Sequence, residues 1–251
     1  MTWNSVMGLV SSVALLCPVI IILRYRLGSH SSFPALLVYY TSMFIYNLFT
    51  EKYIVVHPEV VRYWGLTNNF LDAPLMLTFL LYFSPGPNFS KKLKVLIASY
   101  LLFEMTVITV VGFNTDAVTI ILGPGIVVVL ALFLYFFIRH TKIAITHHKA
   151  FGKATIAAAL LFAYGCFGFI YLMYYVLKTP FVEDTFLVYF LVVTISSFLV
   201  TTGIFLEEKR IRKLAELKQT RRELSDIYGD EKKTVPRKRT VMLDFDREQW
   251  N

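Results

Sequence analysis

Two carboxylic acids, Asp72 and Glu104, lie inside long apolar segments of this 251-residue chain. Asp72 follows the start of its segment at Trp64 by eight residues, and Glu104 precedes the end of its segment at Phe113 by nine. At the rise of an α-helix, these positions are about 12 and 13 Å deep. An ionisable group in hydrocarbon is costly and is a functional hypothesis by default.

The two acids are predicted to meet, because consecutive antiparallel helices are usually neighbours and both positions lie in the same half of the bundle. No Lys, Arg or His lies in the interior of the apolar segments to neutralise them, since Lys94 is the first residue of its segment. Two carboxyls there would therefore resist joint ionisation. Three readings remain open. The pair could bind a proton or cation, hold a polar ligand, or form a hydrogen-bonded clasp between two helices.

Further polar side chains are predicted to converge on the same layer, and Ser, Thr and Asn can hydrogen-bond a ligand or a neighbouring helix. Tyrosines commonly anchor membrane helices at the interface, but two of those in the sixth segment lie deeper. The candidates besides the two acids are Asn47, Thr67, Asn68, Asn69, Tyr164, Tyr171, Ser196 and Ser197.

The chain has seven long apolar segments, which carry the candidate residues. Hydrophobic residues make up 56% of the chain, and the segments lack the apolar–polar alternation of barrel strands. Each segment has about the 20 residues that a helix needs to cross a bilayer. The sequence therefore predicts an all-α bundle of seven transmembrane helices, at residues 3–23, 33–50, 64–83, 94–113, 116–138, 155–177 and 185–206.

The positive charges predict the orientation of this bundle. Of the 25 Lys and Arg residues, 22 lie in alternate connections or after the seventh segment, at residues 207–251. Positive residues stay on the cytoplasmic side, so we expect the N-terminus outside and the C-terminus in the cytoplasm of an inner or plasma membrane. The net charge of +8 then reflects topology and contact with anionic lipid, and no nucleic-acid partner is expected.

The chain divides into three parts: the transmembrane domain (1–206), a helical extension of the seventh helix (207–228) and a basic tail (229–251) that is expected to be disordered. Apolar residues recur along one side of the extension. This stripe could contact a cytoplasmic protein or the membrane surface, or the extension could be a solvated helix. The stripe consists of Ile211, Leu214, Leu217, Leu224 and Ile227.

Common enzyme signatures are absent from the sequence, which has no Gly-rich phosphate loop, no Gly-x-Ser-x-Gly elbow and no His/Glu zinc motif. The five histidines all lie in connections or at segment ends, so they offer no metal or haem pair within the membrane. We therefore expect no cofactor and no metal.

The third segment resembles the third helix of microbial rhodopsins over RYWGLTNNFLDAPLML, residues 62–77. The resemblance implies seven helices with the same orientation. It also implies that Asp72 and Ala73, before Pro74, face a chromophore pocket beside a carboxyl like that of Glu104. The spacing from Arg62 to Pro74 is longer than in that family. The seventh segment has no Lys, and Ser197 is nearest to the position of the retinal-linking Lys. Covalent retinal is therefore not expected.

The preferred hypothesis is a non-enzymatic, opsin-like sensor or signalling module with a pocket at Asp72 and Glu104. The alternative is a proton- or cation-coupled transporter of a small molecule, for which internal repeats would be supporting evidence. A third reading is a lipid-modifying membrane enzyme that uses the two carboxyls as acid and base. The sequence leaves the ligand and the oligomeric state open.

Overall fold

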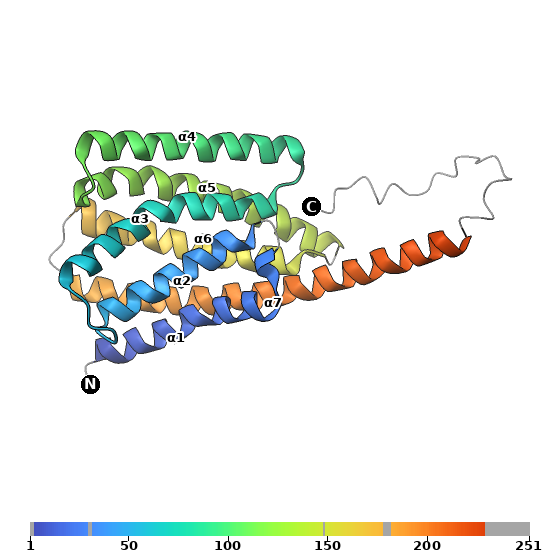
Figure 1. Cartoon of the computed structure of the whole chain (residues 1–251), viewed down its shortest axis with the longest axis horizontal. Coiled ribbons are helices and arrows are strands. Elements are labelled where there is room, and N and C mark those ends of the chain that lie inside the picture. Colours follow the sequence, from blue (N-terminus) through green and yellow to red (C-terminus); the bar gives the residue numbers. More distant parts are fainter. Residues whose placement is uncertain (1–2, 30–31, 148, 178–181, 229–251) are drawn as a thin grey trace.

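A computed structural model describes residues 3–29, 32–147, 149–177 and 182–228, and every regular element in these ranges is helical (Figure 1). The predicted all-α class is confirmed for this part of the chain. The long helices are α1 (Trp3–Arg24), α2 (Phe33–Thr50), α3 (Pro58–Leu80), α4 (Pro87–Val111), α5 (Thr115–His147), α6 (Phe151–Tyr171) and α7 (Val182–Tyr228). Two short 3₁₀ turns, η1 (Leu27–Ser29) and η2 (Leu81–Phe83), and a π-helical turn, η3 (Leu172–Val176), adjoin them. The predicted tail at 229–251 lies outside the described residues.

Helix boundaries follow capping residues as well as hydropathy. Helix α3 begins at Pro58 rather than at Trp64, because proline fits the first turn of a helix and the His57 side chain accepts a hydrogen bond from the Glu59 N–H. The chain leaves α2 after Thr50 and turns through Lys52, whose φ is 60°. The polar turns at the start of α3 thus make the helix begin six residues before the apolar segment predicted at 64–83.

Five described helices are long and apolar enough to cross a membrane: α1, α4, α5, α6 and α7. They identify a chain of the membrane-spanning type. Helices α2 and α3, both described in full, do not reach the same apolarity. They carry tyrosines, asparagines and Asp72 along their length.

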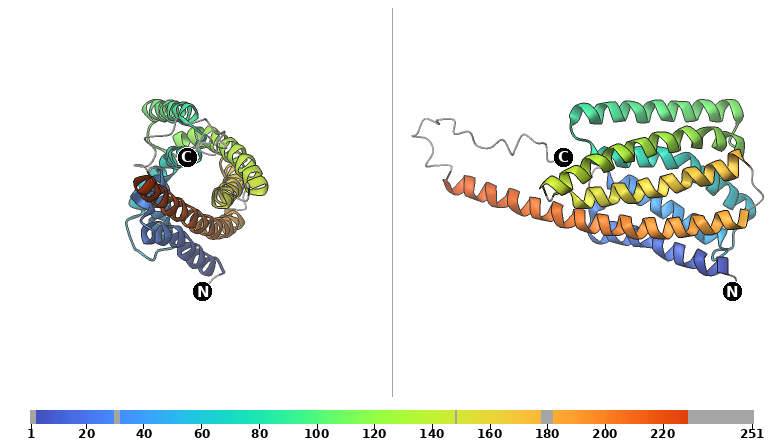
Figure 2. Two further views of the ribbon diagram at one scale, coloured as in Figure 1. Left: turned by 90° about the vertical axis from the view of Figure 1, so that its right-hand side faces the viewer. Right: turned by 180° about the vertical axis from the view of Figure 1, so that it is seen from behind.

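The helices run alternately up and down, so that α1 begins and α2 ends at one end of the bundle, called here the N-terminal end (Figure 1). Six helices form a closed ring in the order α1, α2, α3, α5, α6, α7, with α7 packed back against α1 (Figure 2). Helix α4 lies outside this ring against α3 and α5. Helix α7 projects far beyond the opposite, C-terminal end.

Helix α4 therefore has only a narrow inner face. Its buried residues are Leu93, Tyr100 and Glu104, whereas large apolar side chains such as Leu102 and Val110 are exposed. An exposed apolar helix face of this kind suits contact with lipid. The position of α4 explains why Glu104 points toward α3 and α5 rather than into the ring.

Helices α6 and α7 pack tightly against each other at two glycines. A Cβ atom added at Gly152 would lie 2.6 Å from the backbone N of Glu207, and one added at Gly203 would lie 2.6 Å from Cγ1 of Ile156. Small residues at such contacts let two helix backbones come together in a membrane. These glycines hold α7 against the bundle just before it projects.

Candidate functional site

A partly open cavity of about 270 Å³ lies at the N-terminal end of the bundle. Helices α2, α3, α5, α6 and α7 all contribute to its wall, and none of the described residues in the wall is Lys, Arg or His. The lining residues are Tyr39, Met43, Tyr46, Asn47, Thr50, Gly65, Asn68, Asn69, Asp72, Leu122, Ile126, Tyr164, Phe167, Ile170, Tyr171 and Tyr189.

The polar part of the wall comes from α2 and α3, the two long helices that are not apolar enough to be candidate membrane spans by themselves. The buried Asn47 amide donates to Ser12 Oγ at 2.9 Å and to Ser11 Oγ at 3.0 Å, which ties α2 to α1. Asn68 accepts a hydrogen bond from the Ser42 hydroxyl, which ties α3 to α2. These amides are held in place before any ligand arrives.

The aromatic part of the wall comes mainly from α2, α6 and α7. The Tyr164 hydroxyl donates to Asp72 Oδ1 at 3.0 Å, and Tyr39 also interacts with this carboxyl. Tyr171 is the last residue before the π-helical turn η3. Its hydroxyl donates to the Thr119 carbonyl of α5 at 2.8 Å. Turns of this type recur at functional sites in membrane and soluble helices.

Asp72 is the single acidic residue among the described residues that line the cavity. Its side chain is half-buried because part of its surface faces the cavity. A carboxylate in a low-dielectric wall needs either a proton or a positive partner. The arrangement can therefore hold a proton, a cation or a hydrogen-bond donor.

Glu104 occupies a different environment from Asp72. It is 5% exposed, does not line the cavity, and its Oε1 has no hydrogen-bond partner in the described part of the chain. The two acids are close enough to interact electrostatically, but the described contacts include no hydrogen bond between them. Next to Glu104 on α4, the Tyr100 hydroxyl donates to the Ile121 carbonyl at 3.0 Å.

The remaining predicted residues lie in three places. Asn47, Asn68, Asn69, Tyr164 and Tyr171 line the cavity together with Asp72. Thr67 is exposed and donates to the carbonyl of Tyr63 on its own helix, at 2.8 Å. Ser196 and Ser197 are buried beside a second void of about 10 Å³, which also borders Tyr39 and Tyr164.

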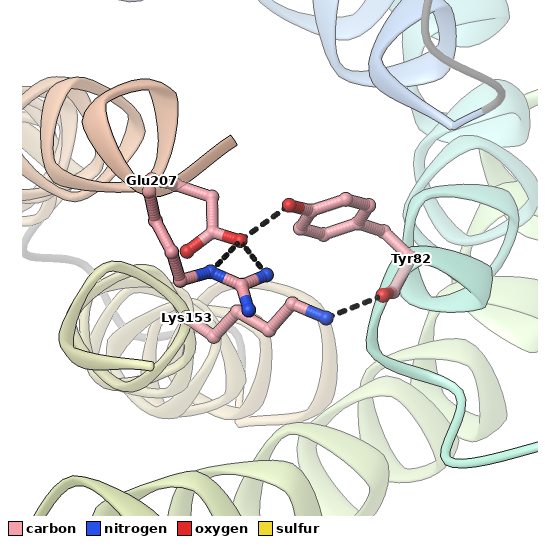
Figure 3. Close-up of polar contacts among 4 residues, drawn as sticks. Tyr82, Lys153 and Glu207 are labelled. Carbon is pink, nitrogen blue, oxygen red and sulfur yellow. Dashed lines mark hydrogen bonds and ion pairs between the residues drawn. The ribbon is translucent and has the colours of Figure 1, made fainter. Parts of the chain in front are cut away.

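A second polar cluster, at the C-terminal end, was not anticipated from the sequence (Figure 3). Glu207 of α7 is 0% exposed, and its Oε1 accepts hydrogen bonds from the Tyr82 hydroxyl at 2.5 Å and from Arg210 Nε at 2.9 Å. Lys153 of α6 is 2% exposed, and its ammonium donates to the Tyr82 carbonyl at 3.2 Å. We call Tyr82, Lys153, Glu207 and Arg210 the exit cluster, because α7 leaves the bundle at this point.

Hydropathy placed Lys153 in a connection and Glu207 at the start of the extension, so neither residue was a site candidate. A local signal was nevertheless present. Gly152 precedes Lys153, and Gly203 lies one helical turn before Glu207, so each charged residue adjoins a small residue that permits close packing.

The described residues contain no group of three or more His, Cys, Asp or Glu side chains that could hold a metal ion. The cavity is the candidate site, because it brings together six of the ten residues predicted from the sequence. The sequence matches no known family model, and neither the curated proteins nor the solved structures contain a match to this chain.

Proposed function

We propose that this chain is a seven-helix membrane sensor that binds a small ligand in the cavity and transmits its occupancy to the cytoplasm through α7. Two observations support seven spans. Five helices are apolar enough to span by themselves, and α2 and α3 bury Tyr39, Asn47 and Asn68 inside the bundle. The distribution of Lys and Arg supports a cavity that opens outside and an α7 that ends in the cytoplasm.

The continuity of α7 is the observation that carries the proposal. This one helix contributes Tyr189 to the cavity wall, contributes Glu207 to the exit cluster, and runs on to Tyr228. Beyond the bundle it exposes Leu217 and Leu224. A displacement or rotation of α7 at the cavity would therefore move a surface that a cytoplasmic partner can contact.

Proton- or cation-coupled transport of a small molecule is the second candidate, because Asp72 lines the cavity without a basic partner in the described wall. A transporter also needs a path to the other side. Bulky buried side chains, including Leu77 on α3 and Phe133 and Phe136 on α5, follow the cavity residues along these helices. Because these side chains block a path through the bundle, the packing favours a sensor over a transporter.

In this proposal, the resemblance to microbial rhodopsins concerns the seven-helix scaffold and not the chromophore.

The proposed topology predicts which residues react from outside intact cells. With Cys17 and Cys166 replaced by serine, a single cysteine at Lys52 should react with a membrane-impermeant maleimide, whereas one at Lys142 should react only after lysis. Both positions are exposed, so access depends on the side of the membrane. Labelling of the cysteine at position 142 in intact cells would contradict the orientation.

If α7 transmits the signal, function should depend on the rotation of its cytoplasmic extension relative to the bundle. Alanines inserted after Arg212 rotate the rest of the extension by about 100° each, so four of them nearly restore its phase. In a deletion strain, complementation should be lost with two inserted alanines and largely restored with four. Immunoblots of the membrane fraction should show equal amounts of each variant.

Equal complementation by all insertions would count against a sensor. In that case, uptake by the out-of-phase two-alanine variant and by the unmodified chain should be compared in proteoliposomes. A transporter, whose work is done within the bundle, should be indifferent to the phase of the extension.

A further inference from the structure

We infer that the cavity binds a small organic cation, with an ammonium group next to Asp72 and the tyrosine side chains around it. This inference rests on the proposed ligand-binding function and names the chemical class of the ligand. Three features of the described wall support it: its charge, its aromatic composition and its size.

The charge of the wall calls for a positive ligand. Among the described residues of the lining, Asp72 is the only one with a carboxyl group, and none is Lys, Arg or His. The two identified contacts of Asp72, Tyr164 and Tyr39, are neutral phenols that donate hydrogen bonds without supplying charge. An ionised Asp72 would therefore lack a counter-charge among the described residues of the wall, and a cationic ligand would provide it.

The aromatic residues of the wall suit an ammonium group. Tyr39, Tyr46, Tyr164, Tyr171 and Tyr189 line the cavity together with Phe167. Aromatic rings attract cations through their quadrupoles, and cages of several rings recognise alkylated ammonium groups. An anionic ligand would instead meet a carboxylate and the negative faces of the rings.

The size of the cavity and the existing hydrogen bonds favour an organic cation over a metal ion. A volume of about 270 Å³ is close to the lower limit of small-molecule sites and far exceeds one ion. Several polar side chains already have partners: the Asn47 amide binds Ser11 and Ser12, and the Tyr171 hydroxyl binds Thr119. A metal ion would need several free oxygen ligands at once.

The test compares cations with neutral molecules of the same shape. The full-length protein in lipid nanodiscs is titrated with tetramethylammonium, choline and phenethylamine. The neutral partners are the carbon analogue of choline, in which tert-butyl replaces trimethylammonium, and phenethyl alcohol. Binding is measured by calorimetry and by the midpoint of thermal unfolding, which a ligand of the native state raises.

At least one cation should bind at least about 30-fold more tightly than its neutral analogue, which corresponds to a charge interaction of about 2 kcal/mol. Asp72→Asn should remove this preference. Tyr189→Leu should weaken binding of the same cation about fivefold, whereas Tyr189→Phe should keep it, because phenylalanine retains the ring face. Glu104→Gln is the matched control, since Glu104 is a buried carboxyl outside the lining that would not contact the ligand, and it should change affinity much less than Asp72→Asn does.

If neutral analogues bind as well as the cations, or if none of the cations binds, the inference is wrong. Asp72→Asn without effect on a bound cation would also overturn it, because the cation would then lie elsewhere. These outcomes are separate from the proposed sensor function. Selective cation binding together with indifference to the alanine insertions would leave the cation site intact and reject transmission through α7.

Discussion

Gly152→Ala is expected to destabilise the bundle, although it adds only one methyl group. The new Cβ would lie 2.6 Å from the Glu207 backbone N and 2.9 Å from its Cα, and backbone atoms cannot move aside as a flexible side chain can. Helices α6 and α7 must therefore separate. Overpacking of this kind costs about 1–3 kcal/mol. The checks are the midpoint of thermal unfolding and the fraction of protein that elutes as a monodisperse peak from size-exclusion chromatography.

Gly165→Ala on the same helix is the matched control. An added Cβ at Gly165 meets nothing within 4 Å, and alanine is a better helix former than glycine by up to about 1 kcal/mol. The same methyl group should thus be neutral or stabilising at 165 and destabilising at 152. Equal effects at the two positions would show that α6 and α7 do not pack as described.

Glu207→Gln is the second change with a large expected effect. Glu207 is fully buried and accepts hydrogen bonds from Arg210 and Tyr82, with Lys153 nearby in the same cluster. Loss of its charge leaves the partly buried Arg210 guanidinium without the carboxylate that it pairs with. Removal of one partner from a buried ion pair costs about 3–5 kcal/mol. The Arg210 side chain is 25% exposed, so solvent screens part of the interaction. We therefore expect Glu207→Gln to lower the free energy of unfolding by about 3 kcal/mol or less.

Glu216→Gln is the control for this prediction, because Glu216 also pairs with an arginine on α7. That pair, with Arg212, joins side chains that are 67% and 74% exposed and 3.6 Å apart. Solvent screens such pairs, so we expect almost no change in stability. A double-mutant cycle with Arg210→Gln should give a coupling energy above about 1 kcal/mol for Glu207. Additive effects in the cycle would reject the buried pair.

The exit cluster also gives the sensor proposal an energetic basis. Its hydrogen bonds join η2, α6 and α7 at the point where α7 loses its neighbours. A shift of α7 would have to preserve or exchange these contacts. Buried polar contacts of this kind favour a small number of discrete helix positions over a continuous range.

The sequence by itself determined the helical class, because long apolar runs bounded by Pro, Gly and charged residues are local features. The segment predicted at 33–50 coincides with α2, and the first segment ends within one residue of α1. Boundaries that depend on capping rather than on apolarity were less accurate, as the start of α3 at Pro58 shows. Asp72 was also a natural candidate, since a carboxyl in an apolar run is unusual in any fold.

The tertiary structure decided which polar residues meet. Asp72 and Glu104 have similar depths, but α4 packs outside the ring, so one acid lines the cavity and the other does not. Lys153 and Glu207 look like ordinary membrane-flanking charges, yet glycine contacts bring α6 and α7 so close that both are buried. Hydropathy gives the depth of a residue along its own helix. Its neighbours depend on the rotation and crossing of whole helices, which arise from side-chain packing between distant segments.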